Sequence, residues 1–404
     1  MEVSTEGRAY GRPAATFDAE LTLVGPGTPM GELMRRYWHP IGLTQDATDT
    51  PRQIRALGED LILFRDKSGR PGLVHPRCCH RGASLFFGKV EECGIRCCYH
   101  GWLFDVEGRC VEQPMNPSAT GKPANVFRQP WYPVKEQYGL IWAYMGPADK
   151  QPVLPRYECL ENLAPGEFVE ADDSSIGSGG PAVVPCNWLQ HFENVLDPDH
   201  LPVLHGTHSG PQFGFLADPA QRPTFVGTAF ASTALGVKCD FMQQLPDGRP
   251  MNMLVEVVFP TIRVVPIPRR DDNLADKTTA FEVVESLGWV LPIDDTHFRI
   301  YVAGRVREPG QLGMLRSRFN GKLWEDMTAE EHQQFPGDFE TQVSQGSITS
   351  HSDERLVAGD QGVVLIRRGL KVQMKRLEAG LDPVGVTFDP NAVPVSLVAG
   401  RYLG

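Results

Sequence analysis

Two short cysteine–histidine pairs constrain the first half of this chain more than any other feature. Cys78 and His80 are followed, after 16 intervening residues, by Cys97 and His100. The chain has 404 residues and nine cysteines, and six of the nine lie between Cys78 and Cys110. In a reducing cytosol such spacing favours metal binding over disulfides. We therefore expect two turns that each supply one thiolate and one imidazole to a metal centre.

This ligand set matches a Rieske [2Fe–2S] cluster, in which two His replace two Cys on one iron. The loss of two anionic ligands raises the reduction potential into a range of about −150 to +300 mV. Gly82 and Gly101 stand beside the ligand pairs and let backbone N–H groups approach the cluster sulfides. A zinc ion with two Cys and two His is the alternative, although zinc ligands more often pair as Cys-x₂₋₄-Cys and His-x₃₋₅-His.

The pattern of apolar runs and turns predicts two domains. From about residue 50 to 145 short apolar runs alternate with turn sequences, as in a small antiparallel β domain. A polar connection around residues 146–182, which includes a Gly/Ser-rich run at 174–181, marks the boundary region, and we place the domains at residues 1–160 and 161–404. In the second domain, residues 251–259 alternate as a strand, and apolar residues between 363 and 377 recur at helical spacing.

Charge and hydropathy argue against several classes of partner. The chain has 39 Lys and Arg against 50 Asp and Glu, a net charge of −11. This balance disfavours binding to nucleic acid or to an anionic membrane surface. We find no apolar run near the ~18 to 20 residues that span a bilayer, and the first residues lack the features of a signal peptide. We expect a soluble, cytoplasmic protein.

A second metal-ligand pattern lies about a hundred residues after the cysteines. The stretch 193–205 reads Glu-Asn-x-x-Asp-x-x-His-x-x-x-x-His and ends with His200 and His205. Two His and one carboxylate on one face of ferrous iron leave positions open for O₂ and substrate. Five residues on a regular α-helix turn through about 500°, so the two His share a face only if the helix is interrupted. Pro198 and Pro202 are expected to interrupt it.

These motifs together resemble the oxygenase (alpha) components of the Rieske non-haem iron aromatic-ring-hydroxylating oxygenases. The opening, residues 23–40, resembles the phthalate-dioxygenase type, and the resemblance covers nearly the whole chain. It implies an α+β fold, with an all-β Rieske domain followed by an antiparallel-sheet catalytic domain with helices, of the helix-grip or START-like kind. The implied cluster ligands are Cys78, His80, Cys97 and His100. Cys79 and Cys98 are expected to be free thiols, since the disulfide positions of respiratory Rieske proteins are here occupied by Ala83 and Tyr99.

The same resemblance implies a mononuclear iron bound by His200, His205 and Asp338. Asp338 precedes the stretch Gln345-Gly-Ser-Ile348, and the rival acids are Glu340, Asp353 and Glu354.

Four further polar positions are interpreted beside this triad. Asp197 is either the cap of a helix or, as the resemblance implies, a bridge from a cluster-ligating His of a neighbouring subunit to an iron-ligating His. Asn187 matches a polar position near the iron. His191 and His208 fall outside the motif and are interpreted as packed or pocket-lining residues.

The implied function is that of a terminal oxygenase in the catabolism of aromatic compounds. It would use O₂ and electrons from NAD(P)H, supplied by a separate reductase that could be of ferredoxin type, to dihydroxylate an aromatic acid such as phthalate or phenoxybenzoate. A homotrimer is implied. The alternatives are a monooxygenase of the same fold that hydroxylates or demethylates, and an electron-transfer protein without oxygenase activity. Arg222, Lys238 and Arg263 are candidate anchors for a substrate carboxylate.

Overall fold

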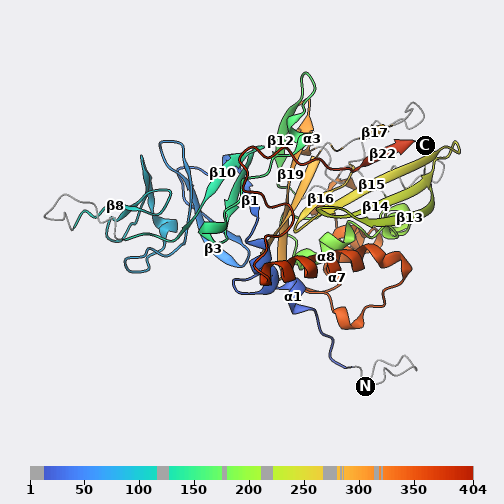
Figure 1. Ribbon diagram of the computed structural model, residues 1–404, viewed down its shortest axis with the longest axis horizontal. Coiled ribbons are helices and arrows are strands. Elements are labelled where there is room, and N and C mark those ends of the chain that lie inside the picture. The colour runs from blue at the N-terminus through green and yellow to red at the C-terminus, as the bar shows by residue number, and fades with distance from the viewer. Residues whose placement is uncertain are drawn as a thin grey trace.

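The computed structural model describes residues 13–115, 127–174, 180–210, 222–266, 280–282, 284, 286–313, 318–319 and 322–403. Figure 1 shows an elongated molecule, with the strands around β8 at one end and a large sheet with its helices at the other. The predicted α+β class is confirmed.

Small antiparallel sheets form the first part of the chain. Two four-stranded sheets have the orders β2-β3-β4-β9 and β5-β6-β7-β8, and a three-stranded sheet has the order β1-β11-β10. The strands are β1 (Trp38–Leu43), β2 (Arg52–Ala56), β3 (Glu59–Arg65), β4 (Pro71–Val74), β5 (Lys89–Glu91), β6 (Gly94–Arg96), β7 (Leu103–Phe104), β8 (Cys110–Glu112), β9 (Trp131–Tyr132), β10 (Val134–Gln137) and β11 (Leu140–Tyr144).

One large sheet dominates the second part, with nine strands among the described residues. Its main path is β12-β19-β18-β16-β15-β14-β13, and β22 pairs with both β15 and β17. The strands are β12 (Phe168–Asp172), β13 (Thr224–Ser232), β14 (Gly236–Gln244), β15 (Pro250–Val258), β16 (Ile262–Val264), β17 (Ala280–Glu282), β18 (Ser286–Asp294), β19 (His297–Val306) and β22 (Gly400–Leu403). A short separate pair is formed by β20 (Arg318–Phe319) and β21 (Lys322–Leu323). The strand predicted for residues 251–259 is confirmed as β15, although the alternation holds only as far as Val255, because Glu256 and Val258 are buried as well.

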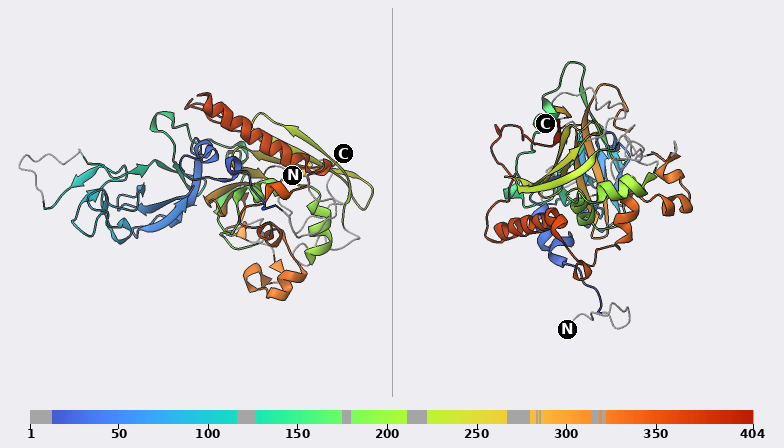
Figure 2. Two further views of the ribbon diagram at one scale, coloured as in Figure 1. Left: turned by 90° about the horizontal axis from the view of Figure 1, so that it is seen from below. Right: turned by 90° about the vertical axis from the view of Figure 1, so that its right-hand side faces the viewer.

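Helix α8 (Gln361–Glu378) lies alongside this sheet, as Figure 2 shows. Its buried side chains include Val363, Ile366, Leu370 and Met374, which confirms the helical spacing read from the sequence. Gly369 allows the close approach, because a Cβ there would lie 2.3 Å from the ring of Phe259. The other α-helices among the described residues are α1 (Ala19–Thr22), α2 (Pro29–Met34), α3 (Glu158–Glu161), α4 (Trp188–Asn194), α6 (Ala329–Gln334) and α7 (Asp338–Ser344).

The junction between the two parts is tightly bonded. The N–H groups of Leu57 and Gly58, in the β2–β3 turn, donate to the carbonyls of Pro292 and Ile293 near the end of β18, both at 2.9 Å. The N-terminal helix α1 packs against α4 and α8, and Lys371 of α8 forms an ion pair with Asp18 at 2.7 Å. The domain boundary at residue 160 stays a prediction. None of the described helices is long and apolar enough to span a membrane.

Candidate functional site

The two cysteine–histidine loops have the same backbone conformation. Gly82 N–H donates to the carbonyl of Cys78 (2.8 Å), and Gly101 N–H donates to the carbonyl of Cys97 (3.1 Å). Each cysteine N–H in turn donates to the carbonyl five residues later, at 2.8 Å in both loops. Both glycines have positive φ, +75° and +73°, which other residues rarely adopt. Glycine at these positions thus makes the tight turns that bring each Cys and His together.

Sulfur and nitrogen donors are arranged in two neighbouring pairs. The thiols of Cys78 and Cys97 are buried, each 3% exposed. Burial raises the pKa of Cys78 to about 12, and the neighbouring Cys97 thiol adds to the increase. The thiol is therefore neutral until a metal cation binds and displaces its proton. The rings of His80 and His100 lie 4.6 Å apart at the surface. Two buried sulfurs and two surface imidazoles fit the donor set of a Rieske cluster.

Trp102 is a neighbour of this site that the sequence reasoning missed. Its indole stacks on the ring of His80, with 4.4 Å between centroids and 4° between planes. The sequence feature that could have indicated this role is the position of Trp102 directly after Gly101 in the second cluster loop. The stack restricts the orientation of the His80 ring.

All nine cysteines are free. Cys79 and Cys98 are exposed thiols, so the prediction that these two remain unpaired is confirmed.

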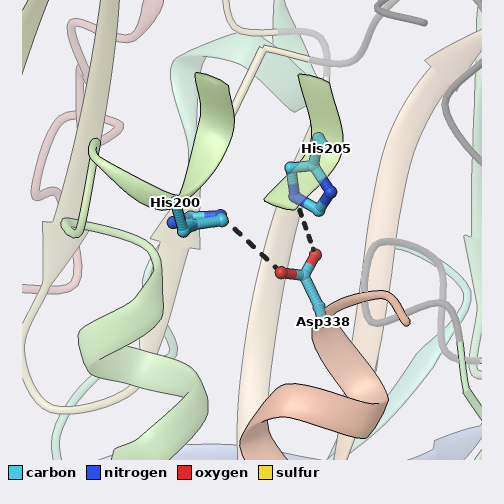
Figure 3. A group of neighbouring side chains, drawn as sticks. All are labelled: His200, His205 and Asp338. Carbon is cyan, nitrogen blue, oxygen red and sulfur yellow. Dashed lines mark ion pairs between the residues drawn. The ribbon is translucent and has the colours of Figure 1, made fainter. Parts of the chain in front are cut away.

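The structure brings together His200, His205 and Asp338, as Figure 3 shows. The Nε2 atom of His200 lies 3.6 Å from Asp338 Oδ1, and the Nε2 atom of His205 lies 3.4 Å from Asp338 Oδ2. One ligand atom from each residue lies within 4.8 Å of the other two. Neighbouring ligands at about 2.1 Å from one ion would lie about 3.0 to 3.4 Å apart, close to the two distances from Asp338 to the imidazoles. The three side chains therefore fit a facial triad around iron.

A π-helix explains why two His five residues apart face the same way. Residues Leu201–His208 form this helix, and Ser209 N–H donates to the carbonyl of Leu204 at 2.8 Å. In a π-helix, residue i+5 lies about one turn after residue i. Helix α4 ends before Pro198, so the predicted interruption of the helix is present. The sequence does not predict that the following segment is a π-helix.

Hydrogen bonds orient both imidazoles. His200 Nδ1 is bonded to the backbone carbonyl of Asp197, and His205 Nδ1 lies 3.4 Å from the hydroxyl of Ser209. Each ring therefore turns its Nε2 atom toward Asp338. A hydrogen bond to one ring nitrogen fixes the tautomer and the ring orientation of a His that binds a metal through its other nitrogen.

Asp338 is the acid that reaches the two His. It begins α7 and is buried, 8% exposed. Burial alone would raise the pKa of its carboxyl, but His205 and His200 hold that pKa well below its usual range. The rivals have other partners: Glu340 accepts from Gly337 N–H (2.7 Å), and Glu354 is paired with Arg367. Asp353 does not belong to the group of three.

The described hydrogen bonds of Asn187 lie away from the triad, and its predicted place near the iron stays a prediction. It is the N-cap of α4: its side chain accepts from Leu189 N–H and donates to the carbonyls of Thr22 and Asp295. The amide beside the triad belongs to Asn194, whose Nδ2 lies 3.4 Å from Asp338 Oδ1. Its position three residues before Asp197, in the Glu-Asn-x-x-Asp stretch, was the signal overlooked.

Asp197 has features of both interpretations. Its Oδ1 accepts from Asp199 N–H at 3.2 Å, which is a local turn-capping bond. Its Oδ2 lies 3.9 Å from His200 Nδ1, and the side chain is 34% exposed. Burial raises the pKa of this carboxyl, and the charge of His200 acts to lower the same pKa. The residue thus joins an iron-ligand candidate to the molecular surface.

The other two His of the region have ordinary roles. His191 is buried and bonded to Gln342 Oε1 (3.1 Å), and burial lowers its pKa to about 3. His208 is exposed and bonded to the carbonyl of Val203 (3.1 Å). Neither belongs to the triad.

Two of the three candidate anchors lie near the triad. Burial lowers the pKa of Arg263 to about 10, and the negative charge of Asp338 acts on it in the opposite direction. Arg263 therefore stays cationic at neutral pH, within electrostatic range of the iron site. Arg222 lies over Gly206, where a Cβ would be 3.4 Å from Nη1. Lys238 lies on β14, where its charge acts on Asp240.

Comparison with known proteins decides the family. Residues 37–132 match the Rieske [2Fe-2S] domain. Over 406 residues the chain is 43% identical to phenoxybenzoate dioxygenase subunit alpha of Ectopseudomonas oleovorans, covering all of this chain and 95% of that protein. The chain belongs to the Rieske oxygenases.

Other similar proteins agree with this assignment. The chain is 35% identical to the oxygenase subunit of tert-butanol monooxygenase / tert-amyl alcohol desaturase of Aquincola tertiaricarbonis, covering 92% of this chain and 79% of that one. It is 31% identical to the phthalate 4,5-dioxygenase oxygenase subunit of Pseudomonas putida, covering 88% and 85%. Among solved structures, the Pseudomonas putida CBB5 NdmA QL mutant with caffeine shares the fold at a TM-score of 0.60 and 17% identity, covering 90% of this chain and 99% of that one.

Membership in the Rieske oxygenases settles the class of activity. The chain is an oxidoreductase, the oxygenase component of its system, and its cofactors are a Rieske cluster and a mononuclear iron. The two cysteine–histidine pairs therefore belong to a Rieske cluster and not to a zinc site. The alternative of an electron-transfer protein without oxygenase activity is excluded.

Proposed function

We propose that this Rieske oxygenase acts on an aromatic acid, with O₂ as oxidant and NAD(P)H as the source of electrons through a separate reductase. The observation that carries the substrate class is the partly buried, cationic side chain of Arg263, whose charge acts on the carboxylate of Asp338. A cationic group in a partly apolar interior favours an anionic ligand, and Arg binds carboxylates with two parallel hydrogen bonds. The name of the phenoxybenzoate dioxygenase relative supports the same class.

We assign the cluster to Cys78, His80, Cys97 and His100, and the iron to His200, His205 and Asp338. When bound, these groups supply one-electron transfer and O₂ activation, chemistry that belongs to the metals rather than to side chains. The chain supplies their orientation. Asn194 is bonded to the carboxylate, and the Asp197 carbonyl and the Ser209 hydroxyl hold the two imidazoles.

We also propose a homotrimer in which the cluster of one subunit meets Asp197 of the next. Within one chain, β8 beside the cluster loops and α7 at the triad lie in different parts of the elongated molecule (Figure 1). The loops around the cluster expose large apolar side chains, among them Phe87 (67%) and Tyr99 (58%). The surface near Asp197 exposes Val203 (56%), on the π-helix. Exposed apolar patches of this kind favour a protein interface.

A cytoplasmic location is proposed as well. Exposed free thiols at Cys79, Cys93 and Cys98 persist in a reducing compartment.

The test is product analysis with ¹⁸O₂, a compatible reductase and a panel of aromatic acids with their methyl esters. We expect turnover of an acid but not of its ester. Arg263→Met should raise KM for the acid by about tenfold or more, the loss of one charge-assisted interaction. Arg263→Lys should recover part of the affinity, and Lys238→Met is the matched control on β14. Equal turnover of acid and ester would contradict the proposed substrate class.

Monooxygenation is the second candidate reaction, since the relative from Aquincola tertiaricarbonis is named a monooxygenase. The labelled product separates the two reactions. Incorporation of two ¹⁸O atoms per product indicates dioxygenation, and one atom indicates hydroxylation or demethylation.

A further inference from the structure

Side chains of α4 contact α7 at successive levels along the two helices. At the end of α4, Asn194 is bonded to Asp338, the first residue of α7. One turn earlier in α4, the Nδ1 atom of His191 lies 3.1 Å from Oε1 of Gln342. Next to it, Gln190 donates from Nε2 to the backbone carbonyl of Gln342 at 2.7 Å. Earlier residues of α4 thus meet later residues of α7, so the two helices run in opposite directions.

The bond between His191 and Gln342 lies in the interior, where the two side chains are 2% and 1% exposed. Burial lowers the pKa of His191 to about 3, so its ring is neutral at physiological pH, with one nitrogen that donates and one that accepts. The Oε1 atom of Gln342 can only accept, and Nδ1 of His191 is therefore the donor. The ring of Phe298, on β19, packs against the imidazole with 5.3 Å between centroids and 32° between planes. The bond thus has a fixed direction.

This polar pair is a costly way to stabilise the fold. Both partners bury a second polar atom, Nε2 in His191 and Nε2 in Gln342, and neither atom has a hydrogen-bond partner in the part of the chain that the structure describes. A buried polar group without a partner costs free energy that an apolar side chain of similar size avoids. Two apolar residues would therefore serve stability better. A directional bond instead specifies one arrangement of two packed elements, which apolar contacts do less strictly.

The arrangement of α7 determines where the proposed carboxylate ligand lies. Asp338 is one helical turn before Gln342, so both side chains lie on the same face of α7. A rotation of this helix would move the Asp338 carboxylate away from Nε2 of His200 and Nε2 of His205, which now lie 3.6 and 3.4 Å from its oxygens. The bond from His191 opposes such a rotation.

We propose that His191 is a positioning residue of the iron site, which acts through Gln342 to hold α7 in the rotation that brings Asp338 to the two imidazoles. This role goes beyond packing, and it rests on the proposed assignment of Asp338 as an iron ligand. Because His191 acts through a second residue, its effect should be smaller than that of a residue bonded to the ligand itself.

The first test compares His191→Asn with His191→Leu. The two new side chains have nearly the same shape, but only the amide of Asn can donate to Gln342 in place of the imidazole. The measurement is the titration of chelator-treated protein, with its cluster intact, with ferrous iron. His191→Leu should lower the affinity about three- to tenfold, less than the 10- to 100-fold typical of a direct contact of a metal ligand. His191→Asn should stay close to the wild-type affinity.

The second test is an apolar pair, His191→Leu combined with Gln342→Met, which removes both unpartnered atoms. The thermal midpoint of the iron-free protein should equal or exceed that of the wild type, while iron affinity stays lowered. A role in stability alone predicts a lower midpoint with unchanged affinity. Gln373→Met is the control, since Gln373 is a buried residue of α8 that accepts from Val384 N–H at 3.1 Å. It should lower the midpoint and leave iron affinity unchanged.

Wild-type iron affinity in both His191→Leu and the apolar pair would overturn the proposal. An equal loss of affinity in His191→Asn and His191→Leu would also overturn it, because the hydrogen bond would then not be the cause. Asp338→Ala separates this inference from the proposed site. If that variant keeps its iron, the proposed ligand set fails. If it loses iron while His191→Leu binds iron normally, only the positioning role fails.

Discussion

The side-chain amide of Asn194 donates a hydrogen bond to Oδ1 of Asp338, with 3.4 Å between the two atoms. The bond joins the last turn of α4 to the first residue of α7, so two segments far apart in sequence are connected at the proposed iron site. It also fixes which face of the carboxylate turns toward His200 and His205.

Removal of this bond should weaken iron binding without unfolding the protein. Asn194→Leu is expected to lower the affinity for ferrous iron by about 10- to 100-fold, the usual effect of losing a contact behind a metal ligand. Iron titration of the chelator-treated enzyme measures it. Asn187→Ala is the paired control: it removes a helix cap at a cost of about 1 kcal/mol, which lowers the thermal midpoint and leaves iron affinity intact. An iron loss in the Asn187 variant alone would contradict our assignment.

Asp338→Ala should separate the two metal centres. We expect the visible spectrum of the cluster to be intact while mononuclear iron and turnover are lost, because the variant removes the one carboxylate between the two His. Iron analysis per chain, compared with the spectrum, is the measurement. Glu340→Gln serves as the control, since Glu340 bonds to Gly337 and Trp324 instead. An Asp338 variant that retains both iron and activity would eliminate this ligand.

Asp197 is expected to matter for electron supply rather than for metal content. Asp197→Asn keeps the local shape but removes the charge 3.9 Å from His200. Turnover with the reductase should fall at least about tenfold, or about 1.4 kcal/mol in the barrier, with cluster and iron both retained.

Oligomers that contain two different variants test whether electrons pass from the cluster of one subunit to the iron of another. Cys78→Ser and His200→Ala chains are each expected to be inactive alone, and combined in one oligomer they should recover part of the activity. No recovery, or a monomer by light scattering, would argue against the proposed trimer.

A buried histidine should make thermal stability fall in mild acid. His39 is 1% exposed and bonded to the carbonyl of Met34 (2.8 Å), and burial lowers its pKa to about 4. The unfolded chain, with a His pKa near 6.5, binds this proton more readily between pH 6.5 and 4. Stability is therefore lost as pH falls through that window, by about 2 kcal/mol at pH 5.

The measurement is the thermal midpoint at pH 7 and pH 5. His39→Gln, whose amide can still donate to the carbonyl, should show a smaller drop than the wild type. His75→Gln, at an exposed His, is the control and should leave the drop unchanged. An equal drop in all three proteins would refute a contribution from His39.

The sequence alone was sufficient wherever a function depends on local spacing. The cluster loops are closed turns of about five residues, so Cys78, His80, Gly82 and their counterparts predict one another without the rest of the fold. The same holds for the faces of β15 and α8, because alternation and helical period follow from backbone geometry. For His200 and His205 the spacing predicts the ligand pair, but only the structure shows the π-helix that turns both toward one side.

The tertiary structure decided what depends on long-range packing. Four acids were compatible with the spacing of the third ligand, and only the placement of α7 against α4 and the π-helix brings Asp338 to the two His. Asn194 contacts Asp338 because it lies at the C-terminal end of α4, whereas Asn187 caps the other end of this helix. The junction between the two parts joins Leu57 and Gly58 to Pro292 and Ile293, and no local pattern predicts such a contact, because it is set by how the packed parts of the fold meet.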